Sequence, residues 1–182
     1  MAIIPQTSYA LGITGTLYEG CLSDTRDAQI DGLRNDLAAS AEALYGKGVC
    51  KSSDTDDKGF ALANVTTQFM GVLVFGMQHE KSATGLLNGE FGSVMRKGRC
   101  WVKVVHAVTP ASLVRMFIAD YSGTTSGAVE GAFGTTLVAT KTALLLNARY
   151  LGRGSAGDLV EVDCLAAGME KQVQQIVESR LD

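Results

Sequence analysis

The chain has 182 residues, of which 46% are hydrophobic and 19% charged, and its formal net charge is −3. This length suits one domain, alone or with an appendage, and the hydrophobic fraction is enough for a packed core. The acidic balance without a basic stripe disfavours nucleic-acid binding, and no apolar run approaches the length of a membrane span. The charged fraction lies below the average for soluble proteins, which indicates that part of the surface lies against a partner.

Residues 1–17 are predicted to form an N-terminal arm that precedes the folded domain. Ile3, Ile4 and Tyr9 are too apolar for a free tail, and Pro5 favours an extended path. We therefore expect this arm to be ordered against a partner, with these three apolar side chains as interface candidates. The same segment has no basic region and only a short apolar run, so we expect no secretory signal peptide.

One short helix is predicted between Asp27 and Leu44, with an irregular path as the alternative. Ile30, Leu33, Leu37 and Leu44 recur at near-helical spacing in a stretch that is also rich in alanine and aspartate, with Asp24 or Thr25 as the cap.

The rest of the chain has the pattern of a mainly β fold. The sequence contains 21 glycines and 2 prolines, and the glycines recur between short apolar runs, as in proteins with many hairpins. We expect a single β domain over residues 18–165, of the jelly-roll-like sandwich or barrel type. Its expected strands are Val49–Lys51, Gln68–Met77, Gly92–Lys97, Arg99–Val108, Leu113–Ala119, Gly131–Phe133, Ala143–Tyr150 and Leu159–Leu165.

Two of these strands carry further information. The V-L-V-F run inside Gln68–Met77 has no polar face and predicts a strand buried on both sides, whereas Leu159–Asp163 alternates and predicts a half-exposed strand. The dipeptide Lys97-Gly98 predicts a tight hairpin turn, because glycine accepts the positive φ that such a turn requires.

The C-terminal tail, residues 166–182, is predicted to be an amphipathic helix. Met169, Val173, Ile176 and Val177 form one apolar stripe, with polar residues elsewhere around the helix. Two alternatives remain open for this stripe: it packs on its own domain or on a neighbouring subunit. These four residues, together with Trp101, complete the set of interface candidates.

No pattern of catalytic or metal-binding residues stands out, and we expect no catalytic residue, no cofactor and no metal. His79 and His106 are separated by 27 positions, and a metal site would need further ligands. The glycine-rich run Gly152–Gly157 lies between two expected strands, which favours a hairpin loop over a dinucleotide site. Asp54–Gly59 lacks the ligands of a calcium loop. We expect the four cysteines to be buried thiols, with disulfides as the alternative: Cys21, Cys50, Cys100 and Cys164.

One stretch of the sequence carries a more specific resemblance. The stretch R-K-G-R-C-W-V-K-V-V-H-A-V-T-P, from Arg96 to Pro110, resembles the central hairpin of the bacteriophage structural cement proteins, which decorate and fasten capsid shells. Further segments are similar to this family in order, and together with this stretch they cover roughly residues 5 to 165: Tyr18–Asp24, Ile30–Ala41, Tyr45–Val49, Phe69–Val74, Ala132-Phe133, Ala148–Leu151 and Ala156–Val162.

The resemblance implies a jelly-roll-like protein on the outside of a phage head, bound over junctions between capsomers and assembled in the host cytoplasm. It implies two partners, the major capsid protein and further copies of the chain itself, with a homotrimer favoured over a homodimer. Neither nucleic acid nor a membrane is an expected partner.

Two alternatives to the cement protein remain. One is a jelly-roll enzyme or carbohydrate-binding module, for which Trp101 and Tyr150 are the candidate aromatic platform. The other is a tail or fibre component of the virion.

Overall fold

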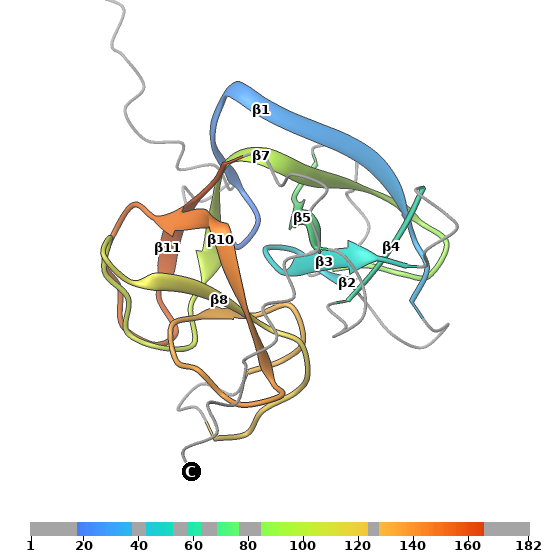
Figure 1. Cartoon of the computed structure of the whole chain (residues 1–182). Helices are drawn as coiled ribbons and strands as arrows, with labels where there is room; N and C mark the ends of the chain where they lie inside the picture. Colours follow the sequence, from blue (N-terminus) through green and yellow to red (C-terminus); the bar gives the residue numbers. More distant parts are fainter. Residues whose placement is uncertain are drawn as a thin grey trace, which may run out of the picture.

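The computed structural model describes residues 18–37, 43–52, 58–62, 69–76, 85–123 and 128–165. Over these ranges the chain consists of strands and the turns that connect them, with no helix (Figure 1). The strands are β1 (Leu22–Asn35), β2 (Ala43–Leu44), β3 (Gly48–Lys51), β4 (Gly59–Leu62), β5 (Phe69–Val74), β6 (Gly85–Leu86), β7 (Phe91–Lys103), β8 (Leu113–Phe117), β9 (Phe133–Gly134), β10 (Thr142–Tyr150) and β11 (Leu159–Cys164).

The long strand β7 lies at the centre of a nine-stranded sheet in the order β1-β4-β3-β5-β7-β11-β10-β8-β9. β1 pairs with both β4 and β7, so the first five strands of this order close into a ring. Just beyond β7, Val104 pairs with Phe133 of β9, which brings the far end of the sheet back to β7. The sheet is therefore curled into two rings that share β7, and the result is sandwich-like (Figure 1).

Each ring has its own hydrophobic core. One core contains Leu73 of β5 and Val94 of β7, and the other contains Val72 of β5 and both Met95 and Val102 of β7. Because neighbouring residues of a strand point to opposite faces, β5 and β7 supply side chains to both cores. Burying one such aliphatic side chain is worth about 1.5–3 kcal/mol, so both cores stabilise the fold, and β5 and β7 connect them.

The structure confirms the mainly β, sandwich-like fold. Strands β3, β5 and β8 to β11 occur at the predicted places, β7 joins two predicted strands into one, and β2, β4 and β6 were not predicted. β5 is buried from Met70 to Val74, as the V-L-V-F run predicts, but Phe75 at the end of that run is 39% exposed. The glycine-rich run 152–157 lies in the connection between antiparallel β10 and β11, as a hairpin loop should. Within the described ranges, no helix is long and apolar enough to cross a membrane.

The predicted helix between Asp27 and Leu44 is wrong where the structure describes this segment: residues 27–35 lie in β1, Ala43 and Leu44 form β2, and residues 38–42 lie outside the described residues. Residues from Leu22 to Asn35 form β1, and Asp31 to Arg34 pair in continuous register with β7. Of the apolar residues that suggested a helix, Leu33 is buried but Ile30 is 40% exposed. Pairing with a distant strand therefore overrode a weak local pattern.

The predicted hairpin turn at Lys97-Gly98 is also wrong, because β7 runs through these residues without reversing. Gly98 does have the positive φ that was expected of it, at 130°. Its Cα is paired with Cys164 of β11, and on the other side β1 bulges between Asp24 and Gln29. The glycine therefore serves a strand irregularity rather than a chain reversal.

Candidate interaction surface

The outward face of β7 carries a stripe of basic and aromatic side chains. Lys97, Arg99, Trp101 and Lys103 occupy alternate positions, so they point to the same side of the sheet. The residues between them are buried, and both lysines are exposed. We call these four residues the β7 stripe.

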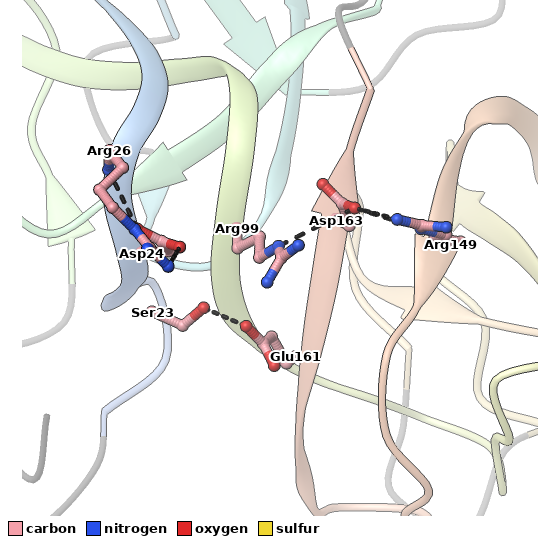
Figure 2. Close-up of polar contacts among 7 residues, drawn as sticks. All are labelled: Ser23, Asp24, Arg26, Arg99, Arg149, Glu161 and Asp163. Carbon is pink, nitrogen blue, oxygen red and sulfur yellow. Dashed lines mark hydrogen bonds and ion pairs between the residues drawn. The ribbon is translucent and has the colours of Figure 1, made fainter. Parts of the chain in front are cut away.

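A row of alternating charges crosses this stripe. In the strand register Arg149 of β10 lies opposite Asp163 of β11, Asp163 lies opposite Arg99, and Arg99 lies opposite Asp24 of β1. The Arg149 guanidinium donates two hydrogen bonds to Asp163 Oδ2, from Nε at 3.1 Å and from Nη2 at 2.8 Å. Arg99 Nε lies 3.9 Å from the same oxygen (Figure 2). The ion pair with Arg149 therefore dominates at Asp163.

At the β1 end of this row, Asp24 is paired with Arg26, which lies two residues away in the same strand. Arg26 donates to the Asp24 carboxylate from its own guanidinium, with Nη2 2.8 Å from Oδ2, and also from its backbone N–H (Figure 2). These hydrogen bonds lower the pKa of Asp24 from 3.8 to about 2. At neutral pH the Asp24 carboxylate is therefore ionised and already hydrogen-bonded to Arg26.

A second row of side chains across the same strands contains Trp101. Trp101 lies opposite Glu161 of β11, and Glu161 accepts a hydrogen bond from the Ser23 hydroxyl (Figure 2). The Trp101 backbone is fixed on its other edge, since its N–H donates to Cys21 O at 2.9 Å and its carbonyl accepts from Gly20 N at 2.7 Å. The half-buried indole therefore has a rigid backbone support.

The cysteines lie in or near the interior of the fold. Cys50, Cys100 and Cys164 are buried and Cys21 is half-buried, and all four are free thiols. Burial raises the pKa of Cys164 to about 12 and that of Cys100 well above its usual value. Within the described parts of the chain, no group of three or more His, Cys, Asp or Glu side chains could hold a metal ion.

Two residues singled out by sequence lie away from the stripe. His106 stacks on Phe117 with ring centroids 5.8 Å apart, and burial lowers its pKa. Tyr150 is 1% exposed and donates its hydroxyl to Gly134 O at 2.9 Å. Because it is a core residue, Tyr150 does not form an aromatic platform with Trp101.

Trp101 is the one predicted interface residue that the structure describes, and it lies in the β7 stripe. The other seven lie outside the described residues, as does His79: Ile3, Ile4, Tyr9, Met169, Val173, Ile176 and Val177. Sequence reasoning missed Arg99, Arg149 and Asp163. The alternation of β11 marked Asp163 as outward-facing, but its partners come from strands that only the fold brings beside it.

The fold and this face define a sandwich-like β protein with an exposed, charged sheet surface. Residues 4–165 match the family described as structural cement protein (E217 gp24/Pam3 gp6). The chain belongs to this family, whose members are structural proteins of the phage virion.

Among solved structures, the chain is similar to one from "The capsid of Myoviridae Phage XM1", with a TM-score of 0.59 and 14% sequence identity. The likeness covers 84% of this chain and 92% of that chain, and at this identity it is a likeness of fold. No curated protein matches the chain.

Proposed function

We propose that this protein binds the outer surface of a phage head and cements the junctions between capsomers. The observation that carries the proposal is the family match over residues 4–165, nearly the whole chain. A protein that binds only the assembled junction stabilises the assembled shell by mass action. The major capsid protein is the partner, and binding follows assembly of the head in the host cytoplasm.

The protein acts as a homo-oligomer, with a trimer favoured over a dimer. In this proposal residues 18–165 are the body, residues 1–17 are an arm ordered against a partner, and residues 166–182 are a helix that contacts a neighbouring subunit or its own body. Linking several modest contacts in one oligomer adds avidity without any very tight single site.

Particles that lack the protein test the proposal. Depleted particles should lose their DNA at lower temperature and under milder osmotic shock than complete particles, and adding the purified protein should restore both limits. Equal resistance with and without the protein would contradict the cement function. Imaging of complete particles should place the protein all over the head, whereas a tail or fibre component would lie at the tail.

Changes in the tail separate its two proposed roles. Replacing Val173 and Ile176 together by Asp places charge on the apolar stripe. If the helix docks between subunits, the oligomer should dissociate while each body stays folded. If it packs on its own body, the monomer itself should lose a few kcal/mol of stability, because charge is then buried without a partner. Sedimentation and thermal unfolding distinguish the two results.

Removing residues 2 to 8 tests the arm. We expect the shortened protein to keep its folded body and to bind depleted particles more weakly than the full chain, because Ile3 and Ile4 are lost from the interface. A shortened protein that saturates particles at the same concentration as the full chain would refute a role for the arm.

A further inference from the structure

We propose that the β7 stripe (Lys97, Arg99, Trp101 and Lys103) is the surface that docks on the shell, and that its counterpart is an acidic, extended segment of the shell protein. This inference rests on the proposed function and adds to it the binding face and the chemistry of the partner.

The first argument is the balance of charge on this face. Of the three carboxylates beside the stripe, Asp163 is paired with Arg149 and Asp24 with Arg26, whereas Glu161 accepts from the neutral Ser23 hydroxyl and keeps its charge. In the part of the chain that the structure describes, Lys97 and Lys103 make no ion pair, and both are exposed. The two lysine charges therefore remain available to a partner.

The second argument is spacing. Residues along a strand rise about 3.3 Å each, so side chains on one face repeat at about 6.6 Å and the stripe is about 20 Å long. An extended partner segment has the same repeat. Carboxylates of such a segment can therefore fall opposite Lys97, Arg99 and Lys103, with an apolar residue opposite Trp101. A compact anion would meet only one of these cations.

The third argument is rigidity. The Trp101 backbone is hydrogen-bonded on one edge to Gly20 and Cys21, and its strand pairs with β11 on the other. A fixed aromatic side chain at the middle of a patch provides contact area with little loss of conformational entropy, and tryptophan is frequent among dominant interface residues. Cations on either side of it give specificity and faster association.

Charge also argues against a nucleic acid as occupant. On the β11 side, Glu161 lies opposite Trp101 and Asp163 lies opposite Arg99, whereas Lys103 lies opposite Leu159. A phosphate backbone carries a charge on every unit, so a phosphate would fall opposite Trp101, next to the Glu161 carboxylate, as well as opposite the cations. A segment with separated carboxylates and an apolar residue opposite Trp101 fits the pattern better.

The experiment measures binding of the purified full-length protein to depleted particles. The Lys97→Glu/Lys103→Glu double variant reverses both free charges, and Arg153→Glu, at an exposed residue of the β10–β11 loop, is a single-site control with the same kind of charge reversal. We expect the double variant to bind at least tenfold more weakly, which is about 1.4 kcal/mol, and to lose most of the salt dependence of binding. The control should stay within about twofold. A Lys97→Gln/Lys103→Gln variant should be intermediate, and thermal unfolding should show all of them folded.

Zero-length crosslinking identifies the counterpart. A carbodiimide joins a lysine amine to a carboxylate in contact with it, so decorated particles should give peptides linking Lys97 or Lys103 to Asp or Glu of the shell protein. Links between two copies of this chain, with an oligomer that dissociates in the double variant, would overturn the inference by showing that a second copy covers the stripe.

The outcomes separate the two proposals. If the unmodified protein does not bind depleted particles, the proposed function fails. If it binds and the double variant binds equally well at every salt concentration, the function stands and the assignment of the stripe is overturned.

Discussion

Gly71 is the position where one added methyl group should matter most. It lies in β5, between β3 and β7, with φ at +156°. A Cβ at this position would lie 2.8 Å from the carbonyl carbon of Met95, closer still to the carbonyl oxygen, and 3.1 Å from Val94 Cγ1. The carbonyl belongs to the backbone of β7, so it has no free rotamer by which to move away.

We therefore expect Gly71→Ala to destabilise the fold strongly. A backbone conformation reserved for glycine costs a side-chain-bearing residue about 1–3 kcal/mol, and overpacking costs about 1–3 kcal/mol more. The stiffer unfolded chain offsets less than about 1 kcal/mol. The net loss is about 1–6 kcal/mol, which for a chain of this length lowers Tm by roughly 2–24 °C.

Gly32→Ala is the matched control. Gly32 lies in β1 with no heavy atom within 4 Å of its added Cβ and no positive φ. Because glycine weakens a strand relative to alanine, this variant should match or slightly exceed the unmodified protein, by up to about 1 kcal/mol. Urea and thermal unfolding of the two variants give the comparison. Equal stability of Gly71→Ala and Gly32→Ala would refute the close approach of β5 to β7.

Three further predictions concern the polar face and the cores. Asp163→Asn should lower the free energy of unfolding by about 1–3 kcal/mol, because two arginines lose their shared carboxylate; urea unfolding measures it. Because the pKa of Asp24 is lowered in the folded protein, its carboxylate stabilises the fold above about pH 4, and this contribution is lost as the pH falls through about 2. Arg26→Gln should raise the pKa of Asp24 toward 3.8, which NMR titration would measure. The buried thiols of Cys100 and Cys164 should resist alkylation at pH 8 until the protein is unfolded, as mass spectrometry would show.

Sequence reasoning succeeded where a strand is defined by its own residues. The V-L-V run of β5 lacks a polar face because both of its faces meet a core, and this property is visible in one short segment. The alternation of β11 was likewise visible, and it placed Glu161 and Asp163 on one side of the strand, but Asp163 is only 6% exposed because arginines of the neighbouring strands lie against it.

It failed where the partner strand decides the structure. β1 has no clean alternation, because four residues bulge between its pairings at Asp24 and Gln29, and its partner β7 lies about seventy positions away in the chain. The row of charged side chains could not be predicted from the sequence for the same reason, since Arg149, Asp163 and Arg99 come from three different strands. At Lys97-Gly98 the local signal was correct for backbone angle but could not tell a turn from a bulge, because both use the same region of φ.

The position of β7 in both rings has a consequence for how the protein is made. The first ring can close once Lys103 has left the ribosome, but the opposite faces of β5 and β7 are covered only when β8 to β11 follow. Ribosomes add roughly 5–20 residues per second, so the 182-residue chain takes about 9–36 s to complete. During the later part of that time, Val72, Met95 and Val102 face solvent on a half-built chain. Association of nascent chains through this uncovered apolar face competes with folding until β11 is in place.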